Sequence, residues 1–231
     1  MTEANKHNEF LYKSSLFLRN GLADVQKNIN KLYQIEELAD YADIKDSPIE
    51  HLQAAVAPLV EQVNDFLDYA HTVTDTMELS LEEVDIHAMI DSVMSIADIL
   101  AERKGGITIE EEIPENLPDI EADPMRLSQA LLNYLHNAIK FTDKGTITLR
   151  VVKEADKIVF EVEDTGIGIA DADQEKVFEP FETILEDKED YRLGFGLGLK
   201  IAEHIIDLHD GETWFESEYG KGSSFFFTVP L

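Results

Sequence analysis

Two amide side chains and one ammonium lie at helical spacing in the segment LLNYLHNAIKFT, residues 131–142. Asn133, Asn137 and Lys140 occupy positions i, i+4 and i+7, so a helix would bring all three onto one face. An amide oxygen is a hard ligand that Mg²⁺ accepts beside phosphate and water, and a lysine supplies a point charge for phosphate. The alternative is a solvated surface, since polar residues at this spacing usually meet water.

Two glycine-rich segments could hold a nucleotide. In DTGIGI, residues 164–169, Gly166 and Gly168 permit a positive φ and a close approach of the backbone to a ligand. Asp164 ends a strand-like run and can accept a hydrogen bond from an exocyclic amine. The segment RLGFGLGLKIAEHI starts at Arg192 and leads from glycines into a helix, whose free N–H groups suit phosphate. Short glycine motifs also occur as ordinary turns. The glycines of this second segment are Gly194, Gly196 and Gly198.

Composition limits the classes of function. The chain has 231 residues, 44% of them apolar, which is enough for one large or two small domains with a core. Its formal net charge of −29 opposes binding to nucleic acid, so we expect no nucleic-acid partner. A polyanion such as ATP would need oriented N–H groups, a few placed cations and a metal ion.

The chain contains no cysteine, which excludes disulfides, cysteine metal sites and a cysteine nucleophile. This composition fits a reducing compartment, and we expect a cytoplasmic location. The first residues, MTEANKHNEF, lack the apolar core of a signal peptide. No run approaches about 18 apolar residues, so we expect no membrane segment in this chain.

Residues 1–80 predict a helical hairpin that serves as a dimerisation domain. Apolar residues recur every seven positions from Leu11 to Ala39, and again from Ile49 to Met77. A sustained seven-residue repeat indicates coiled-coil-like packing. Because a lone hairpin buries little surface, we expect a homodimer that forms a four-helix bundle.

Residues 81–231 predict an α/β sandwich, with helices on one face of a mostly antiparallel sheet, so the fold class is α+β. Helical patterns run from Val84 to Arg103, from Asp123-Pro124 onward, and through LGLKIAEHIIDLH. Strand-like alternation marks ITIEEEI, TITLRVV, KIVFEVED, ETWFESE and SSFFFTVPL.

Four motifs resemble, in their order along the chain, those of the sensor histidine kinases. They are LLNYLHNAIKFT as the N box, DTGIGI as the first glycine box, FEPF as the F box and GFGLGL as the second glycine box. The resemblance covers nearly the whole chain and implies ATP and Mg²⁺ as cofactors. It implies that Asn137 holds Mg²⁺ with Asn133 beside it, and that Asp164 binds the adenine amine. It further implies that Lys140 and Arg192 meet phosphate, while five glycines line the nucleotide: Gly166, Gly168, Gly194, Gly196 and Gly198.

The chain departs from this resemblance at the phosphoacceptor. SLFLRNGL, residues 15–22, matches the pattern S-H-E-L-R-T-P-L, with Leu16 in place of the histidine and Phe17 in place of its acidic neighbour. Leucine has no nucleophile and phenylalanine accepts no proton, so we expect no self-phosphorylation at this position. The Leu-Phe pair would serve as a contact surface or pack against the chain's own ATP domain. Among the other histidines, only His7 weakly resembles the acceptor motif.

Three functions are compatible with these features. The first is a kinase module that binds Mg-ATP and phosphorylates a histidine of another chain. The second is a pseudokinase that binds ATP and docks a partner kinase or response regulator. The third, a gyrase-like ATPase, is disfavoured by the helical hairpin and by Asn133. The related gyrase-like ATPases have a water-activating glutamate at that position, and an amide cannot act as a general base.

Overall fold

The computed structural model describes residues 63–74, 76–182 and 196–231. One compact unit runs from Asp68 to Leu231. Most of the seven-residue pattern lies outside the described residues, and the part inside them is helical over residues 63–74. The hairpin and its four-helix dimer therefore remain predictions.

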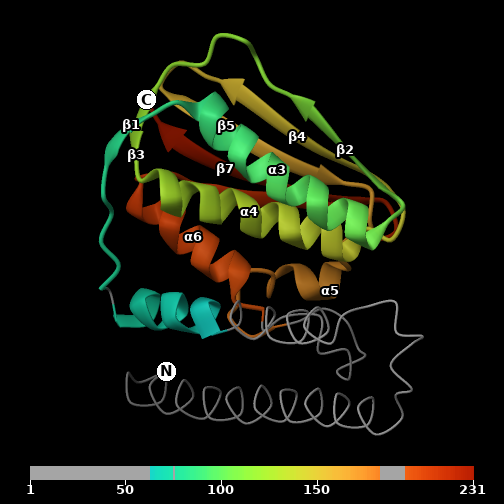
Figure 1. Cartoon of the computed structure of the whole chain (residues 1–231). Coiled ribbons are helices and arrows are strands. Elements are labelled where there is room, and N and C mark those ends of the chain that lie inside the picture. Colours follow the sequence, from blue (N-terminus) through green and yellow to red (C-terminus); the bar gives the residue numbers. More distant parts are fainter. Residues whose placement is uncertain (1–62, 75, 183–195) are drawn as a thin grey trace, which may run out of the picture. The chain divides into compact units, whose positions relative to one another are not determined.

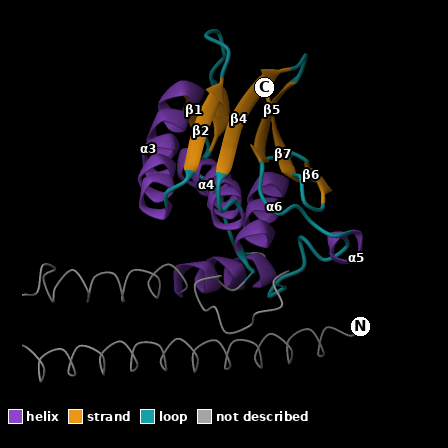
Figure 2. Cartoon of the chain, turned by 90° about the vertical axis from the view of Figure 1, so that its right-hand side faces the viewer, coloured by secondary structure: helices purple, strands orange, loops and turns teal. Residues whose placement is uncertain are grey.

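A five-stranded sheet forms the centre of this unit (Figure 2). Its strand order is β2-β4-β5-β7-β6, and the outer strand β2 is parallel to β4 while every other pairing is antiparallel. The predicted α+β fold with a mostly antiparallel sheet is confirmed. The strands are β2 (Ile107–Glu112), β4 (Gly145–Lys153), β5 (Lys157–Asp164), β6 (Thr213–Glu218) and β7 (Gly222–Pro230).

Alternation along the strands puts one face of this sheet in the core. In β5, Ile158, Phe160 and Val162 are buried, whereas the residues between them are half-buried. Successive side chains of a strand point to opposite faces, so a period of two produces this pattern. The ring of Phe160 stacks on Phe227 of β7, with centroids 4.5 Å apart and planes 4° from parallel.

Three helices cover the buried face: α3 (Ile86–Lys104), α4 (Pro124–Phe141) and α6 (Gly198–Leu208) (Figures 1 and 2). Helix α4 begins where the sequence predicts, because the Asp123 carboxylate accepts hydrogen bonds from the N–H groups of Met125 and Arg126 at 3.1 and 3.0 Å. Its apolar stripe packs between its neighbours and the sheet. The buried residues of α4 are Leu127, Ala130, Leu131, Tyr134, Leu135, Ala138 and Ile139.

The sequence pattern misses the shortest elements. A two-stranded sheet pairs β1 (Glu82–Val84) with β3 (Ile120–Ala122), and α5 (Asp171–Gln174) is a single turn. The predicted helical start at Val84 is wrong by two residues. Val84 belongs to β1, and the Asp85 carboxylate caps the helix by accepting from the Ala88 N–H at 3.1 Å.

Within the ranges that the structure describes, every helix is too short or too polar to cross a membrane.

Candidate functional site

Asn133, the first residue of the polar stripe on α4, contacts the start of α6. The side-chain amide of Asn133 donates a hydrogen bond to the carbonyl oxygen of Gly198, the first residue of α6, at 3.0 Å. A Cβ at Gly198 would lie 3.3 Å from the Asn133 oxygen, so a glycine gives these two helices their close approach. The sequence-predicted Asn133 and second glycine segment are therefore brought together.

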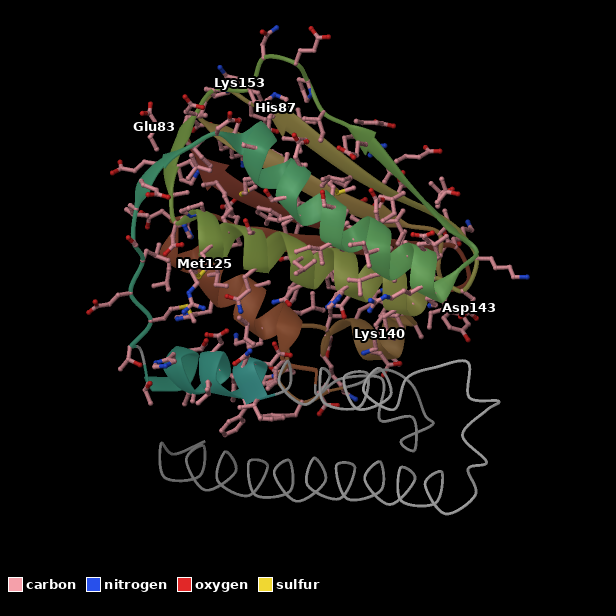
Figure 3. The ribbon with its side chains drawn as sticks, viewed as in Figure 1. Glu83, His87, Met125, Lys140, Asp143 and Lys153 are labelled. Carbon is pink, nitrogen blue, oxygen red and sulfur yellow. The ribbon has the colours of Figure 1, made fainter. Side chains whose placement is uncertain are left out.

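Asn137 and Lys140 lie further along the same helix. Asn137 is half-buried, and its amide has no hydrogen bond to the part of the chain that the structure describes. Lys140 is near the C-terminal end of α4, just before Asp143 (Figure 3). Its ammonium lies 4.8 Å from the centre of the Phe141 ring. Of the two amides, the Asn133 NH₂ group is thus bonded to α6, whereas the Asn137 amide is available to a ligand.

Asp164 is a buried carboxylate at the end of β5. Its side chain accepts a hydrogen bond from the Gly166 N–H at 2.8 Å. Burial raises the pKa of the Asp164 carboxyl to about 6, although hydrogen bonds from the backbone N–H groups of Gly166 and Ser223 favour the charged form and the nearby Glu163 opposes it. A carboxyl with this pKa is mostly ionised at neutral pH and can accept a hydrogen bond from an amine.

The first glycine turn is held between α4 and the β6–β7 turn. The Ile167 N–H donates to the Phe141 carbonyl at 3.2 Å, and the Ile167 carbonyl accepts from the Gly220 N–H at 2.7 Å. A Cβ at Gly166 would lie 2.4 Å from the Phe141 oxygen. Gly168 has a φ of 63°, and a Cβ there would lie 2.1 Å from the Glu218 oxygen. These glycines permit close contacts within the protein itself.

The F box, residues 178–181, is the last motif before the residues that the structure leaves out. Phe178 is half-buried, and its ring centroid lies 6.0 Å from that of Phe215 in β6. Phe181 has a φ of 67°, and its N–H donates to the carbonyl of Gly196 at 3.1 Å. This bond places the predicted Gly196 beside the F box. Leu16, Phe17, Arg192 and Gly194 lie outside the described residues.

Lys104 makes a contact with α4 that the sequence pattern does not identify. It ends α3, and its ammonium donates to two backbone carbonyls at the end of α4. Burial lowers the pKa of this ammonium, although Asp143 opposes the shift. A basic residue in the last turn commonly marks the end of its own helix. The sequence alone gives no reason to expect that Lys104 contacts the end of a different helix.

The donor set fits an Mg-nucleotide. The Asn137 amide lacks a partner within the described residues, and so does the buried hydroxyl of Thr142 at the end of α4. Within the same ranges, no group of three or more carboxylates and histidines could hold a metal ion. A magnesium ion here would therefore take an amide oxygen and rely on phosphate and water for its other ligands.

Comparison with known proteins establishes the family. The family model for histidine kinase-, DNA gyrase B- and HSP90-like ATPases matches residues 122–231. The structure also matches the catalytic domain of histidine kinase ThkA, with a TM-score of 0.56 and 30% identity, over 66% of this chain and 98% of that one. This chain belongs to the histidine kinase family. It carries the ATP-binding domain found in two-component signalling proteins, as the four motifs imply.

Two longer histidine kinases extend the match. Adaptive-response sensory kinase SasA of Synechococcus sp. (strain JA-2-3B'a(2-13)) is 32% identical over 185 residues, which are 79% of this chain and 48% of that protein. Full-length ShkA, whose crystal structure is a complex with AMPPNP, matches with a TM-score of 0.69 and 29% identity, over 95% of this chain and 45% of that one. This histidine kinase chain thus spans about half the length of either relative.

Proposed function

We propose that this histidine kinase chain binds Mg-ATP between α4 and its two glycine turns and works in a two-component phosphorelay. One observation carries the proposal: a buried carboxylate, Asp164, lies at the end of a central strand beside a glycine turn that is hydrogen-bonded to the end of α4. The complex of ShkA with AMPPNP, an ATP analogue, supports the choice of nucleotide.

The base and the phosphates would meet different parts of this site. Asp164 would accept a hydrogen bond from the adenine amine, and burial strengthens such a contact because less water competes for it. The glycine turns would bring backbone N–H groups to the nucleotide, since they carry no side chains that would block it. The glycines assigned to this lining are Gly166, Gly168, Gly194, Gly196 and Gly198.

The magnesium ion would bind at Asn137. Its amide has no hydrogen bond to the described residues, so its oxygen is available as a ligand, with Asn133 beside it on the helix face that contacts α6. Lys140 and Arg192 would bind phosphate as cations. When bound, Mg²⁺ neutralises phosphate charge, which matters in a chain with a net charge of −29.

Titration with ATP in the presence and absence of Mg²⁺ tests this proposal. We expect the wild type to bind more tightly with Mg²⁺, and Asn137→Ala to lose most of that gain while its thermal stability stays unchanged. Asn116→Ala is the matched control, because Asn116 is exposed in the loop that follows the far end of β2. Equal Mg²⁺ dependence in wild type and Asn137→Ala would remove Asn137 as the ligand, and no binding by the wild type would refute the function.

We propose catalysis of phosphoryl transfer to a histidine of another chain. The γ-phosphoryl group would move to an imidazole nitrogen, with ADP as the leaving group and the imidazole proton released. Positioning and charge neutralisation supply most of the catalysis in such reactions, and the motifs of α4 and the glycine turns would provide both. Incubation with γ-labelled ATP and a separate histidine-bearing hairpin should produce acid-labile label on that hairpin only.

A pseudokinase is the second candidate, because Leu16 and Phe17 occupy the acceptor positions. It would bind ATP without transferring phosphate and would dock a partner kinase or response regulator. The double change Leu16→His, Phe17→Glu separates the two candidates. A competent nucleotide domain should then label its own hairpin, whereas a pseudokinase should bind ATP and remain unlabelled.

The seven-residue repeat of the N-terminal residues supports a dimeric signalling protein. We propose that residues 1–80 form the dimerisation hairpin and residues 81–231 the ATP-binding domain, and that the chain works in the cytoplasm. Light scattering of the whole chain should give the mass of two copies, and a monomer at micromolar concentration would contradict this part of the proposal.

A further inference from the structure

The C-terminal end of α4 has every one of its last backbone carbonyls paired. The final four C=O groups of a helix have no partner within the helix itself. In α4, the first of them, on Ala138, accepts from the N–H of Thr142 at 3.1 Å. The last, on Phe141, accepts from the N–H of Ile167 in the first glycine turn at 3.2 Å.

Lys104 pairs the two carbonyls between them. Its ammonium donates to the backbone oxygens of Ile139 and Lys140, each at 2.7 Å. The residue is 35 positions away from the nearer of these, so the contact is made only by the tertiary fold. A positive charge at a helix C-terminus also interacts favourably with the helix dipole.

The chain around Lys104 is itself fixed beside the glycine turn. The Lys104 side chain is 29% exposed, and its ammonium lies 3.9 Å from the carboxylate of Asp143. Two residues later, the carbonyl of Gly106 accepts from the N–H of Gly145 at 3.0 Å. The hydroxyl of Thr165 in the glycine turn accepts from the N–H of Thr146, the residue after Gly145, at 2.9 Å. The end of α3 therefore holds both sides of the loop that joins α4 to β4.

We propose that Lys104 is a positioning residue for the nucleotide site, because it holds the last turn of α4 against the first glycine turn. This inference rests on the proposed function. Lys104 contacts main-chain atoms of α4, so it acts through the residues that meet the nucleotide. When its two hydrogen bonds are lost, the last turn frays and the bond from Ile167 to Phe141 weakens. The spacing between Asn137 on the helix and Asp164 on the strand then varies.

Three variants test the role of Lys104. Lys104→Met keeps the aliphatic stem and removes both hydrogen bonds, whereas Lys104→Arg keeps a cation that can donate to two carbonyls. Val229→Ala is the control for general destabilisation, because Val229 is a buried residue of β7 that pairs with Ile158 at the opposite end of β5 from Asp164. If Lys104→Met does not fold, Lys104→Gln, which has a shorter donor, replaces it.

Two measurements separate positioning from stability. Calorimetric titration with Mg-ADP should show affinity about tenfold lower for Lys104→Met, near wild type for Lys104→Arg, and unchanged for Val229→Ala at temperatures where each variant is folded. Hydrogen exchange of the protein without nucleotide should be faster at the amides of Thr142 and Ile167 in Lys104→Met. Amides of β7 should keep their protection in that variant.

Several outcomes would overturn the inference. Wild-type affinity in Lys104→Met would do so, as would an equal loss of affinity in Lys104→Met and Val229→Ala at matched thermal stability. Unchanged exchange at Ile167 would show that Lys104 does not hold the glycine turn. If the wild type binds no adenine nucleotide, the proposed function fails and this inference fails with it, whatever the exchange data show.

Discussion

The side-chain amide of Asn133 donates a hydrogen bond to the backbone carbonyl of Gly198, at 3.0 Å. This contact joins the middle of α4 to the first turn of α6. A carboxylate cannot donate a hydrogen bond, so the contact depends on the amide. The residue expected beside Mg²⁺ therefore also holds the second glycine segment in place.

Asn133→Asp should destabilise the protein without nucleotide by about 1–3 kcal/mol. The substitution keeps the shape of the side chain but replaces its NH₂ donor by a carboxylate oxygen. The hydrogen bond is lost, and the negative carboxylate faces the partial negative charge of the Gly198 carbonyl oxygen. Urea denaturation followed by circular dichroism measures this change. Asn137→Asp is the matched control on the same helix face, because Asn137 has no hydrogen bond to the described residues. Equal stability of the two variants would show that the Asn133 contact contributes nothing.

Asp164→Asn should raise stability at pH 7 and abolish adenine binding. The amide removes a charge that burial disfavours, which is the cause of the raised carboxyl pKa of about 6. Its oxygen would still accept from the Gly166 N–H, so its NH₂ group would face the adenine amine, donor against donor. Thermal denaturation and calorimetric titration check the two effects. Tight ATP binding by Asp164→Asn would refute the assignment of Asp164 to adenine.

The raised pKa of Asp164 also predicts a dependence of stability on pH. A folded pKa of about 6 lies above the ordinary 3.8, so the folded state binds the proton more tightly than the unfolded state. Asp164 then contributes most to stability below about pH 4, and that contribution falls as pH rises to about 6. The gain in stability of Asp164→Asn over wild type should therefore grow between these values, by up to about 3 kcal/mol, and stay constant above them. A constant difference across this range would contradict the raised pKa.

Nucleotide binding should depend on pH in the opposite direction. The adenine amine donates a stronger hydrogen bond to an ionised carboxylate than to a protonated carboxyl, and a carboxyl with a pKa of about 6 is mostly protonated at pH 5. Affinity should fall about tenfold between pH 7 and pH 5. Adenosine is the suitable probe, since it has no phosphate that titrates in this range, and NMR titration measures its weak binding. Constant affinity would show that the base does not contact Asp164.

The sequence predicts those parts of the fold whose signals are local. KIVFEVED alternates along its length because β5 is buried on one face only, and Asp123-Pro124 starts α4 through a capping contact. The elements β1 and α5 escape prediction because three or four residues are too few to establish a period. In β1, two exposed glutamates leave only Val84 to mark a buried face.

The sequence likewise identifies some residues of the candidate site and misses others. Asn133, Asn137 and Asp164 stand out in the sequence because polar residues interrupt apolar patterns there. Lys104 does not stand out in the sequence, because its hydrogen bonds to α4 depend on how α3 packs against α4. The sequence also predicts that the glycines let the backbone approach a ligand. In the structure, Gly166 and Gly198 permit close contacts within the protein, with Phe141 and Asn133.

Arg150, on the face of the sheet opposite the helices, tests whether repulsion among the surface carboxylates lowers stability. Its guanidinium bonds to Glu112 and Glu161 on the two neighbouring strands, each at 2.6 Å, and lies 3.6 Å from Glu163. Arg150→Met would leave three carboxylates close together in a chain of net charge −29. We expect a loss of about 2–5 °C in melting temperature in low salt, and a smaller loss in 1 M NaCl because salt screens the repulsion.

Lys221→Met is the control for this change, since it removes the same charge from a single exposed pair with Glu218. Such pairs contribute little to stability, so its melting temperature should stay within about 1 °C of wild type. Differential scanning calorimetry at both salt concentrations measures the two variants. If Arg150→Met loses as much stability in high salt as in low salt, packing of the arginine stem, and not repulsion among the carboxylates, causes the effect.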